Sequence, residues 1–119
     1  MTTLLARTQA KPVDRRELVQ ALTGWAAATR HEPGVIQLSV SEDLERPNVF
    51  LAVVTWRDDG GLERHVAGQA FSVLYGALLV LASSSEFEIA GSGSGPVDGN
   101  AFVHRVRARS AAERRTEGG

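Results

Sequence analysis

The sequence predicts an α+β fold in which one antiparallel sheet is backed by helices, with elements in the order βαββαβ. Strand-like and helix-like segments alternate along the chain, and one strand, Val49–Trp56, is apolar on both of its faces. The chain has 119 residues, of which 43% are hydrophobic. This length and composition suffice for a single hydrophobic core.

The first strand and the first helix are expected within residues 3–31. Residues 3–9 are compatible with a strand. Asp14 followed by Glu17 resembles a capping box, which marks the start of a helix over about residues 13–31. The side chains that would face the core recur at helical spacing: Leu18, Leu22, Trp25 and Thr29.

The next two strands differ in their apolar pattern. Val35–Glu42 alternates apolar and polar residues, as a strand with one buried face does. Val49–Trp56 is apolar at both parities, so both of its faces need cover. Helices cover only one face of a single sheet, and a second copy of the chain is the simplest cover for the other. The sequence therefore predicts a homodimer.

A helical region is expected from Leu62 to Leu81, with Gly68 and Gly76 as points where it bends or divides. Residues 85–90 alternate as a fourth strand. Right-handed crossovers then place the strands antiparallel in the order 4-1-3-2, which is a ferredoxin-like arrangement. This domain is expected to span residues 1–91.

Residues 92–119 are expected to form a Gly/Ser linker and a basic C-terminal tail, disordered at its end, with 102–107 as a candidate fifth strand. The tail carries five arginines against two glutamates from Arg105 onward, and the net charge of the whole chain is −1. An acidic body without interleaved aromatic residues argues against nucleic-acid binding.

Composition excludes several kinds of site. The chain has no cysteine, which removes disulfides, iron–sulfur clusters, thiolate zinc sites and cysteine nucleophiles. No two histidines lie at metal-ligand spacing, so no metal is expected. No stretch approaches about 18 consecutive apolar residues, so we expect no membrane association and a cytoplasmic location.

Several short motifs resemble the antibiotic-biosynthesis monooxygenase (ABM) family of the dimeric α/β-barrel superfamily. Glu32-Pro33-Gly34 precedes the second strand, Trp56 closes the third, His65 lies nine residues further on, and Phe71 follows six residues after it. The resemblance covers about residues 3–90 and implies a dimeric α/β barrel built from two ferredoxin-like sheets.

The resemblance implies a cofactor-independent monooxygenase that oxidises an electron-rich aromatic, such as a quinol or a polyketide intermediate, with O₂. The substrate is deprotonated, its anion reduces O₂ by one electron, and recombination gives a peroxide that collapses to a quinone. The same family implies two alternatives, an isomerase or cyclase, and a non-catalytic accessory protein that binds a small ligand. The haem-ligand pattern of the haem-degrading members is absent, and no cofactor is expected.

His65 is the candidate catalytic base, because an imidazole takes a proton at working pH. A structural histidine that hydrogen-bonds locally remains the alternative. Trp56, Phe71 and Tyr75 are candidate walls of an aromatic pocket, and a plain core position is the alternative for Trp56 and for Tyr75. Arg7 is a candidate substrate-binding residue because it is a charge on a strand expected to be largely buried, and pairing with a carboxylate is the alternative.

Overall fold

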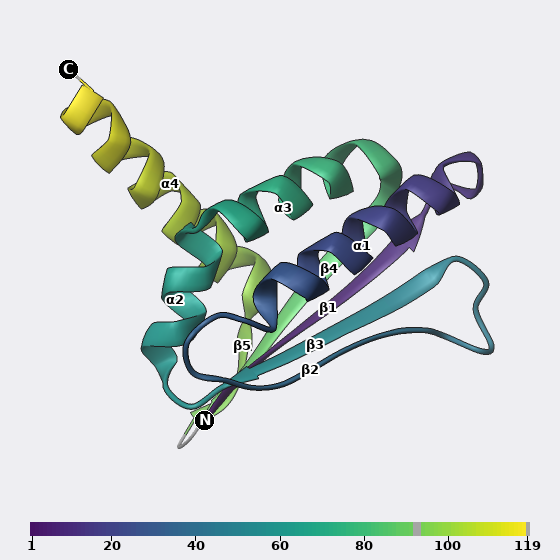
Figure 1. The fold of residues 1–119 in the computed structure, drawn as a ribbon, viewed down its shortest axis with the longest axis horizontal. Helices are drawn as coiled ribbons and strands as arrows, with labels where there is room; N and C mark the ends of the chain where they lie inside the picture. The colour runs from purple at the N-terminus through teal and green to yellow at the C-terminus, as the bar shows by residue number, and fades with distance from the viewer. Residues whose placement is uncertain (92–93, 119) are drawn as a thin grey trace.

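The computed structural model describes residues 1–91 and 94–118 as one antiparallel sheet with helices packed on one side of it (Figure 1). The strands are β1 (Thr2–Ala10), β2 (Val35–Glu42), β3 (Val49–Trp56), β4 (Ala82–Gly91) and β5 (Ser94–Asp98). The helices are the short 3₁₀ turn η1 (Pro12–Asp14), α1 (Arg15–Thr29), α2 (Asp59–Ala67), α3 (Gln69–Leu81) and α4 (Gly99–Gly118).

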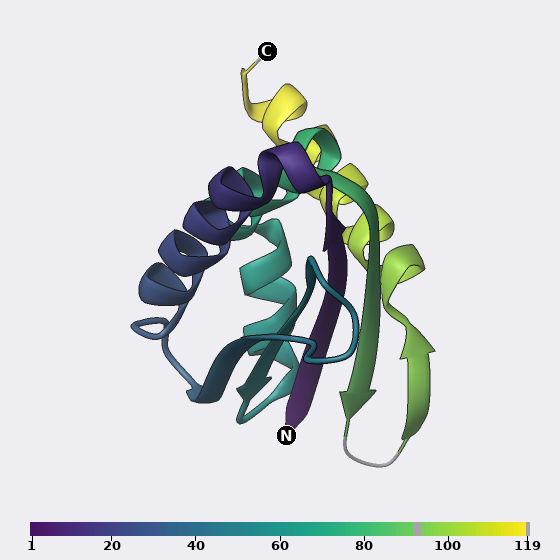
Figure 2. The same cartoon turned by 90° about the vertical axis from the view of Figure 1, so that its right-hand side faces the viewer.

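The strand order is β2-β3-β1-β4-β5, and every neighbouring pair is antiparallel. The first four strands therefore lie in the predicted order, and the ferredoxin-like fold is confirmed. A fifth strand, β5, extends the sheet beyond β4. Figure 2 shows α1 and α2 standing on the same side of the strands.

The two faces of the sheet have different surroundings. Side chains of even number on β1 and β3, such as Leu4 and Val54, point toward the helices and are fully buried. Side chains of odd number, such as Leu5, Leu51 and Val53, point to the other face and are only half-buried. This outer face carries the second apolar surface that the sequence predicted for β3, and the helices leave it open to solvent in the single chain.

The long helical region of the sequence divides at Gly68, as predicted. Asp58 caps the start of α2 by accepting a hydrogen bond from the Gly61 amide at 2.9 Å. Gly68 is extended and separates α2 from α3, and the two helix axes meet at an angle of 60°. Gly76 lies inside α3 without interrupting it. Among the described helices, none is by itself long and apolar enough to cross a membrane. Only α2 and α3 taken together reach that length and apolar composition, and they are bent relative to each other.

The predicted strand at residues 102–107 is wrong, because this segment belongs to α4. The alternation of apolar and polar residues there is also compatible with helical spacing, and tertiary packing decides between the two. Val103 and Val106 lie three residues apart on the face of α4 that joins the core, and both are buried. Asp98 stabilises the helix start by accepting hydrogen bonds from the amides of Asn100 and Ala101.

The expected linker and disordered tail also require correction. Residues 94–98 form β5, which pairs with β4, and α4 continues the ordered structure to residue 118. Residues 92–93 and 119, which the sequence placed in the linker and the tail, lie outside the described residues. The C-terminal part of the chain therefore adds to the same core as the rest of the domain.

Candidate active site in the aromatic core

A cluster of aromatic rings surrounds His65 between the sheet and the helices. The imidazole of His65 lies on α2, and its ring centre is 5.2 Å from that of Trp56, 5.5 Å from that of Phe71 and 5.7 Å from that of Trp25. Trp56 points inward because it shares the even parity of β3. Gly61 lets α2 approach its indole, since a Cβ at Gly61 would lie 2.6 Å from the Trp56 ring.

Both ring nitrogens of His65 are hydrogen-bonded. The indole Nε1–H of Trp25 donates to Nε2 at 3.0 Å. Since an indole nitrogen only donates, Nε2 must carry the lone pair and the proton of the neutral ring must sit on Nδ1. Nδ1 donates that proton to the carboxylate of Glu32, whose two oxygens lie at 2.9 and 3.0 Å.

Burial decides the charge of this histidine. His65 is 2% exposed, and burial lowers its pKa below the ordinary value, while the nearby Glu32 carboxylate opposes that shift. The ring is therefore neutral at neutral pH and keeps a lone pair on Nε2. A neutral imidazole with a carboxylate behind it has the composition of a general base. In this structure its lone pair is taken by the Trp25 indole.

Trp56 has a buried hydrogen-bond donor with no acceptor. The residue is 1% exposed, and its Nε1 has no hydrogen-bond partner among the described residues. A second polar atom of this kind, Oγ1 of Thr29, lies on α1 and is also buried. Native proteins pair nearly all buried polar atoms, so such an exception calls for a physical account.

Tyr75 lies one ring further from His65, toward α4. It is half-buried on α3, and its ring stacks at 6.0 Å from Phe71 and 6.3 Å from Phe87. The guanidinium of Arg107 lies over the Tyr75 ring at 4.7 Å. Tyr75 also lines a hollow of about 250 Å³ together with Leu78 and Phe87. It thus extends the aromatic cluster and does not contact the His65 ring.

Arg7 lies on the outer face of the sheet, which the strands separate from the aromatic cluster. It is exposed, and its neighbours in register on β3 and β4 are Leu51 and Glu86. It lines a hollow of about 500 Å³ with Gln9, Glu86 and Arg46. The structure therefore brings His65, Trp56, Phe71 and Tyr75 together and leaves Arg7 apart from them.

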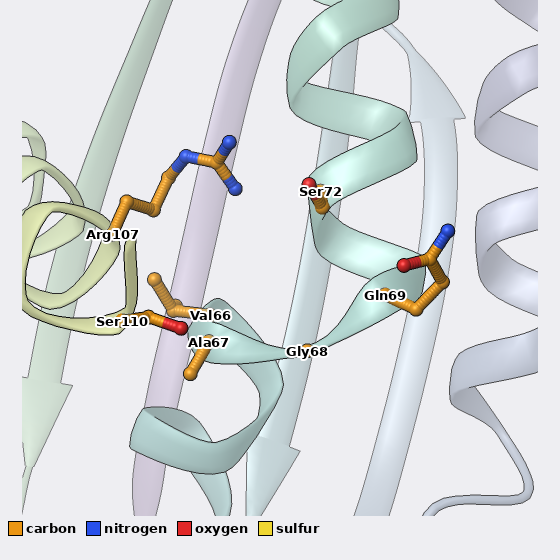
Figure 3. Close-up of a pocket in the computed structure, with 7 residues that line it drawn as sticks. All are labelled: Val66, Ala67, Gly68, Gln69, Ser72, Arg107 and Ser110. Carbon is orange, nitrogen blue, oxygen red and sulfur yellow. The ribbon is translucent and has the colours of Figure 1, made fainter. Parts of the chain in front are cut away.

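Another hollow, of about 290 Å³, lies where α2 meets α3, beside α4 (Figure 3). Arg107 and Ser110 face it from α4, and Ser72 and Gln69 face it from α3. Its lining includes none of the residues predicted for the site. No group of three or more His, Asp or Glu side chains within residues 1–91 and 94–118 is placed to hold a metal ion.

Sequence reasoning missed Glu32 and Trp25 as members of this site. The sequence indicates Glu32 only as part of the Glu-Pro-Gly motif before the second strand, and Trp25 only as a core position of the first helix. Each lies more than thirty residues before His65 along the chain, and the hydrogen bonds that join them are tertiary. The only local signal was the Glu-Pro-Gly motif, which the family resemblance already contained.

The fold and the aromatic core define a ferredoxin-like α+β domain with a buried histidine at the centre of its ring cluster. A model of the antibiotic biosynthesis monooxygenase family matches residues 1–74, which is more than half of the chain. The chain therefore belongs to this family. No curated protein matches it.

Solved structures share the fold. A candidate antibiotic biosynthesis monooxygenase from Deinococcus radiodurans is 28% identical to this chain, with a TM-score of 0.74 over 80% of this chain and 95% of its own. A protein from Pseudomonas aeruginosa is 26% identical, with a TM-score of 0.69 over 78% and 94%. A mutant of SnoaB, a cofactor-independent oxygenase from Streptomyces nogalater, is 20% identical, with a TM-score of 0.68 over 78% and 93%. At that identity the last likeness shows the fold alone.

Proposed function

We propose that this protein is a cofactor-independent monooxygenase that oxidises an electron-rich aromatic, of the quinol or polyketide type, with O₂ at the His65 cluster. Family membership supports the reaction class, and a structure 28% identical to this chain is described as a candidate antibiotic biosynthesis monooxygenase. The observation that carries the proposal is the buried Nε1–H of Trp56, which lies beside the His65 ring and has no hydrogen-bond partner in the described part of the chain.

A buried donor without a partner costs about 1–3 kcal/mol of stability. An oxygen atom of a bound substrate would supply the missing acceptor and turn that cost into binding free energy. Trp56 stands next to the imidazole, so an oxygen held by its indole would lie in the same aromatic environment as His65. A phenolic oxygen fits this role because it can accept from Trp56 while its own hydrogen is donated elsewhere.

His65 is the proposed proton acceptor. The substrate hydroxyl gives its proton to Nε2, and the Glu32 carboxylate stabilises the imidazolium as it forms. The substrate anion transfers one electron to O₂, and the resulting radical and superoxide combine to form a carbon–oxygen bond. The peroxide takes up a proton and loses water, so one oxygen atom remains on carbon as a quinone carbonyl. The rings of Trp56 and Phe71 would keep water from the intermediates.

The functional unit that we infer is a homodimer formed through the outer face of the sheet. Leu5, Leu51 and Val53 lie side by side there across β1 and β3. An identical patch on a second copy is self-complementary about a two-fold axis. Burying each such Val or Leu contributes about 1.5–3 kcal/mol. In such a dimer Arg7 would lie at the contact between the two sheets.

A second candidate function is a non-catalytic protein that binds a small aromatic ligand. The specific observation in its favour is that both nitrogens of His65 already have partners inside the chain. A ligand could then bind against Trp56 without any proton transfer. An isomerase would use the same base as the oxygenase and differ only in consuming no O₂.

The test measures oxygen uptake with a panel of quinols and anthrone-type substrates, and at the same time the absorbance of the quinone product. His65→Gln should reduce kcat by about 10²–10⁴-fold. Trp56→Phe keeps an aromatic side chain, although a smaller one, and removes the donor. It should reduce kcat by about 10²-fold or more if that donor holds the developing oxyanion. His31→Gln, at an exposed position two residues beyond the end of α1, is the matched control and should leave turnover unchanged.

Thermal melting curves of each variant distinguish a loss of the catalytic base from a loss of the folded structure. Unchanged turnover in His65→Gln would reject its catalytic role. Binding of an aromatic with no oxygen uptake and no chemical change by any panel member would favour the binding protein over the oxygenase. Chemical conversion without oxygen uptake would favour the isomerase.

A further inference from the structure

The acceptor nitrogen of His65 is occupied in the resting chain. Trp25, on α1, is 5% exposed and donates its indole N–H to Nε2 at 3.0 Å. A substrate hydroxyl needs the same lone pair, since Nδ1 already carries the ring proton and faces Glu32. Any proton transfer to His65 therefore requires that Trp25 first gives up its hydrogen bond.

Glu32 determines which nitrogen is available. Its carboxylate receives the Nδ1 proton at 2.9 and 3.0 Å, and this contact holds the ring in the tautomer with the lone pair on Nε2. With the other tautomer, Nε2 would carry a hydrogen and would face the indole N–H donor directly. Two donors would then oppose each other in a buried site, which is unfavourable.

We propose that Glu32 and Trp25 are positioning residues of His65: Glu32 holds the lone pair on Nε2, and the Trp25 indole occupies that lone pair until a substrate hydroxyl displaces it. This inference rests on the proposed function. It also deepens it, because competition with the Trp25 indole makes a free hydroxyl on the aromatic a requirement for binding at His65 as well as for proton transfer. A ring without a hydrogen-bond donor cannot replace the bond that Trp25 makes.

The surroundings of His65 leave few other groups to control its proton. The rings packed against it come from α1 (Trp25), β3 (Trp56) and α3 (Phe71). Of the described residues, Glu32 supplies the charged side chain hydrogen-bonded to it. Protonation of Nε2 would also place a second donor against the Trp25 indole. The resting bond therefore favours a neutral ring, in agreement with the effect of burial.

The first test reads the tautomer directly, by ¹⁵N NMR of the histidine ring in the full chain. The wild type should show the Nδ1–H tautomer. Glu32→Gln keeps an acceptor oxygen and should keep that tautomer, whereas Glu32→Ala should shift the population toward Nε2–H. Turnover should follow the tautomer, so that Glu32→Gln retains more activity than Glu32→Ala. An Nε2–H ring in the wild type would overturn the proposal, as would an unchanged tautomer in a folded Glu32→Ala variant.

The second test measures competition for Nε2. The indole N–H signal of Trp25, identified by its loss in Trp25→Phe, should shift on titration with 2-naphthol and not with its methyl ether, which lacks the hydroxyl. Trp25→Phe should bind 2-naphthol roughly three- to tenfold more tightly, the equivalent of one net hydrogen bond. It should also raise the pKa of His65, because the neutral ring loses the bond that stabilises it.

If the Trp25 indole signal does not shift at saturating 2-naphthol, the hydroxyl does not displace Trp25 from Nε2, and the proposed role of Trp25 is wrong. The same holds for equal effects of the ether and the naphthol, and for a Trp25→Phe variant that binds neither. Displacement of Trp25 by hydroxylated aromatics without any oxygen uptake would leave the positioning roles standing and would reject the oxygenase reaction. The failure of one proposal is therefore distinguishable from the failure of the other.

Discussion

Replacing Gly61 by alanine tests how closely α2 is packed on the indole of Trp56. A methyl group at this position would lie 2.6–2.9 Å from three atoms of the Trp56 side chain. Real Cβ atoms do not approach other heavy atoms so closely, and both Gly61 and Trp56 are buried. The indole or the first turn of α2 must therefore shift.

The expected loss in the free energy of unfolding is about 1–3 kcal/mol, the usual cost of overpacking a core by one methyl group. For a domain of this size each kcal/mol lowers the melting temperature by roughly 3–6 °C. Because α2 also carries His65, the shift should weaken turnover or ligand binding as well as stability. Gly24→Ala is the matched control: nothing lies within 4 Å of its Cβ, so the same change inside α1 should stabilise the protein.

Thermal and urea unfolding of the three proteins measure the difference, and the indole N–H signal of Trp56 reports the local displacement. Gly61→Ala should melt below the wild type and Gly24→Ala above it. A Gly61→Ala variant with unchanged stability and an unmoved Trp56 signal would show that the indole is not held against α2, and the description of the aromatic core would be wrong.

Three further predictions concern the dimer, the charge of His65 and the C-terminal helix. By light scattering, Val53→Glu on the outer face should give a monomer near the chain mass of 12.7 kDa, whereas Val73→Glu on the exposed side of α3 should keep about twice that mass. A monomeric wild type would contradict the inferred dimer. Since the folded pKa of His65 is lowered, the unfolded chain binds the proton more readily, so stability should fall as pH drops below about 6.5, by at most about 1.4 kcal/mol per pH unit. Urea midpoints at pH 7.5 and 5.0 should show a smaller loss in His65→Gln, and an identical loss would exclude His65 as its source. Val103→Ala should lower the free energy of unfolding by roughly 1–3 kcal/mol, whereas Ala108→Ser, at an exposed position of α4, should change it little. Amide hydrogen exchange should be slow at Val103, and fast exchange there would mean that α4 is not packed on the core.

The sequence contained most of the information on the sheet. Val35–Glu42 alternates with a period of two, and Val49–Trp56 is a continuous apolar run. Both are local patterns, and the structure confirms both strands and their order. The Asp58 cap and the break at Gly68 are equally local, because each depends on one residue's backbone or side chain. Such features can be predicted since the responsible residues are neighbours in the chain.

The C-terminal part was predicted less well. Phe102, Val103 and Val106 fit a short strand and a helix about equally, and local periodicity gave no basis for a choice. The helix forms because Val103 and Val106 bury against the rest of the core, a contact with residues distant in the chain. The free energy of that burial depends on the packed structure and cannot be inferred from the local sequence.

By itself, the sequence determined the order of the first four strands, the helical regions before β4 and the aromatic identity of the core, because hydrophobic periodicity and turn residues act over a few positions. It also singled out His65 and Trp56 as candidates. The tertiary structure alone decided what their polar atoms meet: Glu32 and Trp25 at the imidazole of His65, and no partner among the described residues at the Trp56 indole. A hydrogen bond depends on distance and direction between atoms from distant segments, and those are set only when the segments pack together.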